Sequence, residues 1–248
     1  MPKFIPILLN GARGRMGQAI QAVAAEHHIT VAASVSNGDD PAAGIHECAA
    51  VVDFSFHTAT LPLVELATKH SKPCIIGTTG HSDEERGAIG ALATILPMVW
   101  AGNFSIGVNL LNALTGQAAE TLGAEYQPEV IEMHHRHKRD APSGSAEQLI
   151  RTVRAARGLT AHQERYGRHG VLSERPDAEI GVHAIRGGDI IGEHTVLFAG
   201  PGERLELTHR ASDRHIFAHG ALRAVHWALR QKPGLYTMAH VLDLPRAP

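Results

Sequence analysis

Histidine and basic side chains cluster in the stretch EMHHRHKRDAPSGSAEQL, which runs from Glu132 to Leu149. Such residues could bind a metal, form a solvated basic surface, or hold an anion and give it a proton. Zinc sites combine cysteine, histidine and carboxylate ligands at characteristic spacings. The stretch has no cysteine and no H-x-x-x-H pair of histidines, and its arginines and lysine would repel a cation. The pattern therefore disfavours a metal and leaves the other two alternatives.

An anion site explains more of this stretch than a solvated surface does. In an extended chain, side chains two residues apart share a face. His134, Arg136 and Lys138 would then point one way, and His135 and His137 the other. Histidine titrates near neutrality and can donate the proton that a conjugated imine needs after it accepts a hydride.

A helix start directly after the basic residues supplies a second anion-binding feature. Pro142 ends the extended run, and SGSAEQLI predicts a helix with Ser145 and Gln148 in capping-box spacing. The N–H groups of Gly144–Ala146, at the positive end of this helix, would suit a carboxylate. A proton donor, a lysine and a carboxylate cradle thus fall within a short stretch of chain.

Three glycines, Gly11, Gly14 and Gly17, separate the first predicted strand from the first predicted helix. Glycines at such a turn let the backbone approach a pyrophosphate, which rests on the helix N-terminus. The spacing is G-x-x-G-x-x-G rather than G-x-G-x-x-G, so the loop alone also fits a plain tight turn. Its place before four further strands favours a dinucleotide site. The small polar stretches Gly77–Gly80 and Ala101–Ser105 are expected at strand ends in the same crevice, where their backbone groups would meet a nicotinamide.

The end of the second predicted strand bears on the choice between NADH and NADPH. A carboxylate usually holds the ribose 2′-hydroxyl there, but this chain has Ser36 and Asn37, unless the Asp39–Asp40 pair folds back. Arg13 and Arg15 lie in or beside the glycine loop. The sequence therefore predicts that NADPH is used at least as well as NADH, with the alternative that neither arginine touches the cofactor.

Alternating elements in the first hundred residues must position the glycine loop. Short apolar runs predict strands at 3–10, 29–35, 49–55, 72–80 and 97–103, and helical periodicity predicts helices at 14–28, 57–70 and 82–96. Ser82 and Glu85 predict a capping box, and Pro62 fits the first turn of a helix that begins near Leu61. Strands that alternate with helices indicate a parallel sheet covered on both faces.

The pattern changes after Asn103, and the basic stretch lies in this second part. Helices are predicted at 106–123, 143–158 and 212–232, and strands at 127–135, 178–187, 193–200 and 203–212. The turns RGGD and GPGE are hairpin signals, so the sequence predicts an open, mostly antiparallel sheet. The fold class is therefore α/β, with a Rossmann-type parallel sheet domain at 1–104 and a second, α+β domain at 105–215 for substrate binding.

Bulk properties exclude several function classes. The chain has 248 residues, a formal net charge of -2 and a pI near 6.8, which give no overall reason to bind nucleic acid or an anionic membrane. No apolar run approaches the ~18 residues needed to span a bilayer, and the N-terminus lacks a signal-peptide pattern. Cys48 and Cys74 each stand alone, which is typical of a reducing compartment. We therefore expect a cytoplasmic protein without a metal.

The stretch EMHHRHKRDAPSGSA resembles the signature E-x-H-H-x-x-K-x-D-x-P-S-G-T-A of the dihydrodipicolinate reductase family. GARGRMG, VVDFS, GTTG, AGNFSIGVN and GDIIGEHTVLFAGPGERLELTHRA also resemble that family, in its order and over nearly the whole chain. The resemblance implies NAD(P)H-dependent reduction of 4-hydroxy-tetrahydrodipicolinate, a small cyclic dicarboxylate, in the diaminopimelate route to lysine. It also implies a Rossmann-type domain completed by 216–248 and a sheet domain that assembles homotetramers.

The same resemblance implies roles for individual residues. His134 would be the proton donor and Lys138 a second donor at the substrate nitrogen, while His135, Gly144 and Ser145 would bind the dicarboxylate. The residues implied in cofactor binding are Gly11, Ala12, Arg13, Gly14, Arg15, Met16, Gly77, Thr78, Thr79, Ala101, Gly102, Asn103 and Phe104. Ser145 stands where the family commonly has threonine and keeps the hydroxyl. The short segment Asn37–Ala50 trims a loop near the adenosine end.

Two other functions remain as alternatives. The chain could be another oxidoreductase on the same scaffold, such as an amino-acid or semialdehyde dehydrogenase, although such an enzyme has little use for paired carboxylate cradles beside H-H-x-H-K. It could also be a non-catalytic protein that senses the cofactor, although such a protein need not keep His134 and Lys138. Turnover of the cyclic substrate with NADPH discriminates among the three.

Overall fold

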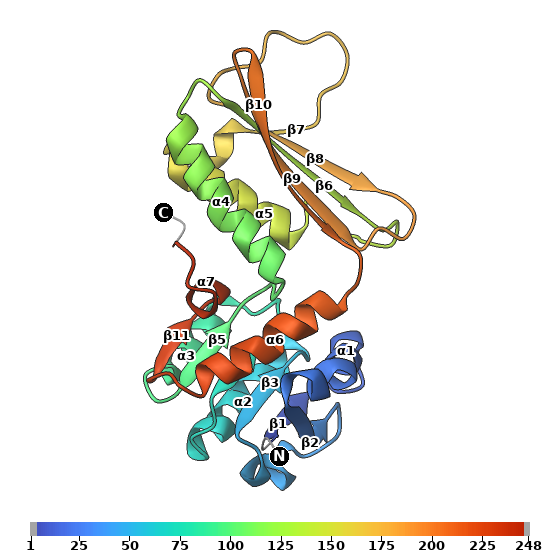
Figure 1. The fold of residues 1–248 in the computed structure, drawn as a ribbon, viewed down its shortest axis with the longest axis vertical. Coiled ribbons are helices and arrows are strands. Elements are labelled where there is room, and N and C mark those ends of the chain that lie inside the picture. Colours follow the sequence, from blue (N-terminus) through green and yellow to red (C-terminus); the bar gives the residue numbers. More distant parts are fainter. Residues whose placement is uncertain (1–3, 246–248) are drawn as a thin grey trace. The chain divides into compact units, whose positions relative to one another are not determined.

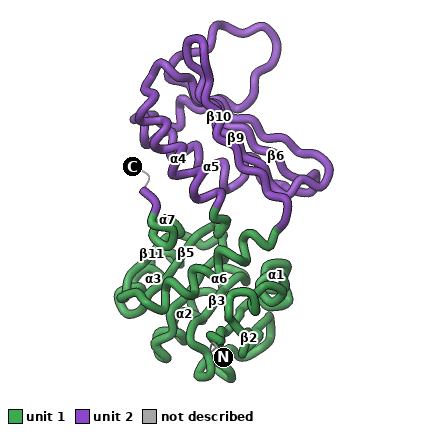
Figure 2. The backbone as a smooth tube through the Cα atoms, viewed as in Figure 1, with its two compact units in different colours: residues 1–106, 214–243 green, residues 107–213, 244–248 purple. Residues whose placement is uncertain are grey.

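The computed structural model describes residues 4–245, so Lys3, where the sequence predicts the first strand to begin, lies outside the described residues. The chain divides into two compact units (Figure 2). Unit 1 combines the chain up to Ile106 with Arg214–Asp243, and unit 2 consists mainly of Gly107–Asp213. The boundaries expected from the sequence, 104/105 and 215/216, fall within two residues of these.

Unit 1 is built on a six-stranded parallel sheet in the order β11-β5-β4-β3-β1-β2 (Figure 1). Asn10, Asp53 and Ile76 are in register at the C-terminal ends of three neighbouring strands. The loops that follow these strands therefore begin at one edge of the sheet. The strands are β1 (Ile5–Asn10), β2 (Ile29–Val35), β3 (Ala50–Asp53), β4 (Cys74–Ile76), β5 (Pro97–Trp100) and β11 (Gly234–Tyr236).

Helices cover both faces of this sheet, because side chains of adjacent strand residues point to opposite faces. Ile7 and Leu9 pack with α1 and α6, whereas Leu8 packs with α2 and α3. Every one of these three side chains is buried. The Rossmann-type part of the predicted fold is thus confirmed. The helices are α1 (Arg15–Val23), α2 (His57–Lys69), α3 (Asp83–Leu92), α6 (His215–Ala228) and α7 (Met238–Val241).

Local signals in unit 1 differ in how well they predict helix ends. The capping box of Ser82 and Glu85 is present and starts α3. The placing of Pro62 in a first helical turn is wrong, because α2 begins at His57 and contains Pro62 in its interior. Of the helix predicted at 14–28, only the part up to Val23 is α-helical, and the 3₁₀ helix η1 (Ala24–His27) follows it. The short β11 and α7 carry no periodicity that the sequence could reveal.

Unit 2 contains a five-stranded sheet in the order β10-β9-β6-β8-β7. Pairings β10–β9 and β9–β6 are antiparallel, whereas β6–β8 and β8–β7 are parallel, so the sheet is mixed. Helix α5 packs with α4 against Val130, Val182 and Val196 on one face. The elements are α4 (Ile106–Leu122), β6 (Gln127–His134), α5 (Gly144–Arg157), β7 (Glu164–Tyr166), β8 (Ile180–Arg186), β9 (Gly192–Gly200) and β10 (Glu203–Ala211).

One of the two predicted hairpins is wrong. The GPGE turn does join β9 to β10 as a hairpin, with Gly202 at φ +78°. The RGGD turn instead connects β8 and β9 across β6, which lies between them. Its backbone bonds to the chain that leaves β6: Gly187 N donates to His134 O at 2.9 Å, and Arg136 N donates to Gly188 O at 3.2 Å. The turn therefore borders the basic stretch.

Strand β10 forms an edge of the unit 2 sheet, and only part of its predicted apolar face is buried. Leu207 packs against the core, but Leu205 on the same face is 38% exposed. In the described residues, no helix is both long and apolar enough to cross a membrane.

Candidate active site

Strand β6 turns Glu132 and His134 toward the helix-covered side of unit 2. Every second residue of this strand is buried, from Pro128 through Val130 to His134. Glu132 therefore occupies a position where an apolar side chain would be expected, and it has no exposed surface. A buried charge is costly unless it is paired and hydrogen-bonded, so its partners define the site.

Glu132 collects partners on both carboxylate oxygens. Oε2 lies 2.5 Å from His134 Nδ1, and Oε1 accepts from the backbone N–H of Ser143 at 3.1 Å. The guanidinium of Arg186 binds both oxygens, at 2.9 and 2.7 Å. Burial alone would raise the pKa of Glu132, but the hydrogen bonds from His134 and Arg186 lower it to about 2. The carboxylate is thus an anion that faces two cationic or titratable groups.

A second histidine, His194 of β9, lies beside this pair. Its ring stands edge-on to that of His134, with centroids 5.2 Å apart, and its Nε2 lies 3.1 Å from Ser143 Oγ. Burial and the neighbouring His134 lower the pKa of His194 to about 4. His194 is therefore neutral at physiological pH. Its Nδ1 is buried and has no hydrogen-bond partner among the described residues.

The chain turns after His134, so the predicted alternation through residue 138 is wrong. Strand β6 ends at His134, and the backbone N–H of Lys138 donates to His135 O at 3.1 Å, which closes a turn. Lys138 Nζ pairs with Asp140 at 2.9 Å, and this contact lowers the pKa of Asp140. Arg136 Nε donates to His137 at 3.2 Å. The turn forms because the backbone bonds to the RGGD loop replace a continuing strand.

Helix α5 begins at Gly144, and its N-cap differs from the predicted one. Ser143 is the N-cap, and its Oγ accepts from Ala146 N at 3.2 Å. The proposed box of Ser145 and Gln148 is therefore wrong, and Ser145 lies inside the first turn. Ser143 also bonds both Glu132 and His194, so the N-terminal turn that contains Gly144 and Ser145 is fixed next to His134.

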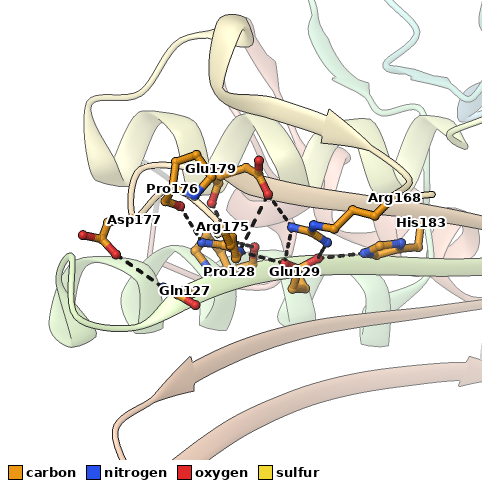
Figure 3. A network of polar contacts seen from close by, with 9 residues as sticks. All are labelled: Gln127, Pro128, Glu129, Arg168, Arg175, Pro176, Asp177, Glu179 and His183. Carbon is orange, nitrogen blue, oxygen red and sulfur yellow. Dashed lines mark hydrogen bonds and ion pairs between the residues drawn. The ribbon is translucent and has the colours of Figure 1, made fainter. Parts of the chain in front are cut away.

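A second charged network in unit 2 fixes a loop rather than the basic stretch (Figure 3). Glu129 lies on the opposite face of β6 from Glu132 and pairs with Arg168, Arg175 and His183. Arg175 also donates to the carbonyl oxygens of Pro128 and Glu179. Burial would raise the pKa of Glu129, but bonds from Arg168, His183 and Arg175 lower it. The network holds the segment between β7 and β8 against the sheet.

The glycine loop of unit 1 has the geometry that a pyrophosphate site needs. Gly11 has φ +82°, and a Cβ there would lie 2.2 Å from Phe54 O. A Cβ on Gly17 would lie 2.3 Å from Gly11 O, so this glycine lets α1 pack closely. Gly14 is the N-cap of α1, and no side-chain hydrogen bond caps this helix. These are the three glycine roles of a dinucleotide loop, and the residues fit that group.

Asp53 joins the loops at the sheet edge and was not assigned a role from the sequence. It is buried, and its Oδ1 accepts from Asn10 Nδ2 at 2.9 Å and from Ser55 Oγ at 2.5 Å. Its Oδ2 accepts from Thr60 and Thr78 at 2.7 and 2.9 Å. Thr78 is an expected cofactor residue, and Asn10 precedes the glycine loop. Asp53 thus ties the ends of β1, β3 and β4 together.

The remaining expected cofactor residues fall at the edges of unit 1. Arg13 pairs with Asp39 at 3.5 Å, and Asp39 also accepts from Ser36 N at 2.9 Å, so this aspartate does fold back to the end of β2. Phe104 is buried and packs against Phe54, with ring centroids 5.5 Å apart. Its side chain belongs to the core of unit 1, and its carbonyl oxygen packs against Gly220 of α6, where a Cβ would come within 1.8 Å of it. The other expected positions are Ala12, Arg15, Met16, Gly77, Thr79, Ala101, Gly102 and Asn103.

Sequence reasoning missed Glu132, Ser143, Arg186 and His194 as parts of the site. One signal could have found Glu132: it falls on the buried face of a strand whose other members are Val130 and His134, and a carboxylate there must be paired. Arg186 and His194 reach the site through strand pairing, because His134 and Glu132 are in register with them. Single-sequence patterns do not give that register. In residues 4–245, no group of three or more possible ligands could hold a metal.

Comparisons with known proteins decide the family. The profile described as "Dihydrodipicolinate reductase, N-terminus" matches residues 5–104, and "Dihydrodipicolinate reductase, C-terminus" matches residues 107–242. The chain belongs to the dihydrodipicolinate reductase family. A relative from Akkermansia muciniphila, named 4-hydroxy-tetrahydrodipicolinate reductase, is 47% identical over 97% of this chain and 99% of its own length. One of the same name from Anaeromyxobacter sp. is 40% identical over 98% and 100%.

Solved structures show the same fold. A dihydrodipicolinate reductase from Paenisporosarcina sp. TG-14, bound to dipicolinate, has a TM-score of 0.73 at 23% identity and covers 94% of this chain and 97% of its own. An amine dehydrogenase from Mycobacterium smegmatis has a TM-score of 0.57 at 12% identity, over 98% and 97% of the two chains. The scaffold is therefore shared beyond the reductase family, and the likeness to the dehydrogenase concerns the fold alone.

Proposed function

We propose that this protein catalyses the NAD(P)H-dependent reduction of 4-hydroxy-tetrahydrodipicolinate in the diaminopimelate route to lysine. Family membership and the names of both full-length relatives support this activity. The observation that carries the chemistry is the contact of His134 Nδ1 with the buried Glu132 carboxylate. This contact leaves Nε2 as the nitrogen that can donate a proton to a bound ring.

The residues of unit 2 take the following roles in the proposal. His134 donates the proton that the ring needs once it has accepted a hydride. Lys138 is a second donor at the ring nitrogen, and its exposed partner Asp140 can give way to a substrate carboxylate. His135, with Gly144 and Ser145 in the first turn of α5, binds the dicarboxylate. A substrate with two carboxylates suits this basic turn and the positive end of a helix.

Unit 1 would hold NADPH or NADH, and the nicotinamide supplies the hydride when bound. Gly11–Met16 cradle the pyrophosphate at the N-terminus of α1, while Gly77–Thr79 and Ala101–Phe104 offer backbone groups to the nicotinamide. Asp39 folds back to the end of β2, where its carboxylate could hold the ribose 2′-hydroxyl of NADH, but Arg13 can bind the 2′-phosphate of NADPH when it leaves Asp39. We therefore still propose that NADPH is used at least as well as NADH. Comparing kcat/KM for the two cofactors tests this, and a strong preference for NADH contradicts it.

The decisive experiment follows NADPH oxidation with substrate freshly made by the preceding synthase reaction. His134→Gln should lower kcat by ~10²-fold or more if this histidine is the acid, and Lys138→Ala should also lower turnover. His137→Gln is the matched control, because His137 lies in the same turn and has no assigned role. Equal activity of His134→Gln and the wild type would remove His134 as proton donor.

The same assay separates the alternatives. Another oxidoreductase, such as an amino-acid or semialdehyde dehydrogenase, would turn over its own substrate and leave the cyclic imine unreduced. A cofactor-sensing protein would bind NADPH, with a measurable Kd, and show no turnover. The amine dehydrogenase with a similar fold keeps the first alternative in view, but the family match favours the reductase.

We further propose a cytoplasmic homotetramer that assembles through unit 2. The face of the sheet opposite α5 carries partly exposed apolar side chains, namely Ile131, Met133 and Ile185, the last of these 44% exposed. Analytical ultracentrifugation should give a tetramer mass, and a monomer at micromolar concentration contradicts the assembly. The cytoplasmic location is supported by Cys48 and Cys74, both of which are buried free thiols.

A further inference from the structure

We propose that Glu132 and Arg186 act together as positioning residues that hold His134 by Nδ1 and set the pH range in which it gives up its proton. This inference rests on the proposed role of His134 as proton donor and concerns how that role is tuned. It assigns a function to a buried ion pair that does not itself need to touch substrate.

The contacts of His134 determine which of its ring nitrogens is available to donate a proton. Glu132 Oε2 lies 2.5 Å from Nδ1, and the carboxylate is itself fixed by Arg186 and by the N–H of Ser143. The ring therefore cannot rotate without breaking a buried bond. Gly192 on β9 leaves room at the other nitrogen, since a Cβ there would lie 3.0 Å from Nε2. Nε2 is thus the donor atom, at a fixed position.

Arg186 also links the ion pair to the turn that carries Lys138. Besides its two bonds to Glu132, its guanidinium donates to the backbone carbonyl of Asp140 at 2.6 Å. Asp140 in turn pairs with Lys138. One side chain thus couples the anchor of the proton donor to the basic turn.

The Glu132 carboxylate is shared between His134 and Arg186. Alone, the Glu132 anion would hold a proton on His134 firmly. Arg186 engages both oxygens, so the charge of the carboxylate is shared between a guanidinium and the imidazole. His194 is neutral at physiological pH and adds no competing charge. The groups around His134 are Glu132 on its own strand, Arg186 at the end of β8, His194 on β9, and Lys138 with Asp140 in the following turn.

The test is the pH profile of kcat in two variants that should move it in opposite directions. In Glu132→Gln the anion is lost while Arg186 stays, so the protonated donor forms only at lower pH. We expect the profile to shift to lower pH by about one unit, which lowers kcat near neutrality by up to ~10-fold. In Arg186→Met the anion is no longer shared, so the profile should shift to higher pH. KM for the substrate should change much less than kcat in Glu132→Gln.

Controls separate this inference from a purely structural role and from the proposed function. Arg168→Met removes an arginine from the Glu129 network on the same sheet (Figure 3) and should leave the profile in place. If both site variants lose activity equally at every pH, the pair is only structural and the inference fails. If His134→Gln is fully active, the proposed donor itself fails.

A measurement on the unaltered protein covers the case in which a variant does not fold. In protein labelled with ¹⁵N-histidine, NMR should show the His134 Nδ1 proton far downfield and protected from exchange, as a short bond to a buried carboxylate requires. A His134 ring with its proton on Nε2 alone and no Nδ1–H signal, from acidic to neutral pH, overturns the inference.

Discussion

Two buried carboxylates, Asp53 in unit 1 and Glu132 in unit 2, are stabilised by different kinds of hydrogen-bond donor. Both side chains are almost fully withdrawn from solvent, and both oxygens of each are hydrogen-bonded. The donors to Asp53 are one amide and three hydroxyl groups. The donors to Glu132 are a guanidinium, an imidazole and a backbone N–H.

The difference in donors teaches what each carboxylate can do. Hydroxyl and amide donors fix geometry and do not titrate, so Asp53 holds the strand ends of the cofactor site in place. A titratable imidazole couples Glu132 to proton transfer, and Arg186 balances its charge. A carboxylate held by neutral donors is thus a scaffold, whereas a carboxylate held by an arginine and a histidine can also tune chemistry. Each prediction below alters one side of this comparison.

The largest effect is expected when one member of the Glu132 pair is removed. Glu132→Leu leaves Arg186 partly buried without its counter-ion, which should lower the free energy of unfolding by about 3–5 kcal/mol. The double variant Glu132→Leu with Arg186→Leu should recover part of that loss, because no uncompensated charge remains. Urea unfolding measures both. If the double variant is as unstable as the sum of the two single variants, the charges are not coupled and the comparison loses its basis.

The next effect is a pH dependence that belongs to the Glu132 side alone. The folded state lowers the pKa of His194 from 6.5 to about 4, so the unfolded chain binds more protons between these values. Stability should therefore fall as pH falls from 6.5 to 4, by up to about 3 kcal/mol. His194→Asn should flatten this slope in unfolding experiments at several pH values. His162→Asn, which alters an exposed histidine of the 3₁₀ helix η4 (Ala161–Gln163), should leave it unchanged.

The same comparison shows how far the sequence predicts this molecule. Period and glycine spacing located β1, α1 and the dinucleotide loop, because these signals are local. The ion pair was not predicted, since Arg186 and His194 meet β6 only through a register in which β8 is parallel and β9 antiparallel. The hairpin predicted at the RGGD turn is wrong for the same reason: its residues suit a hairpin, but β6 lies between the two strands that the turn connects. The Asp53 cluster was missed because its donors come from the end of β1, two loops and α2.

A smaller effect is expected for Asp53. Asp53→Asn replaces one acceptor oxygen by an NH₂ that faces hydroxyl donors, which should cost about 1–3 kcal/mol. The loops after β1 and β4 should also loosen, so the Kd for NADPH should rise while the pH profile of kcat keeps its shape. Thr60→Val, which removes a single donor from α2, should cost about 1 kcal/mol. If the pH profile of kcat shifts in Asp53→Asn, Asp53 is not only a scaffold, and it does not differ from the Glu132–Arg186 pair in the way proposed.

The smallest effect is expected at the start of α5, where alanine variants of Ser143 and Ser145 test which serine belongs to the Glu132 cluster. Ser143 caps this helix and bonds His194, whereas Ser145 lies in the first turn. Ser143→Ala should therefore cost about 1–2 kcal/mol of unfolding free energy, and Ser145→Ala should cost less, because Ser145 does not cap the helix. In the proposed function Ser145→Ala should instead raise KM for the dicarboxylate. If Ser145→Ala is the less stable variant, the N-cap lies at Ser145, and the bond from Ser143 N–H to Glu132 would then be incidental to the helix.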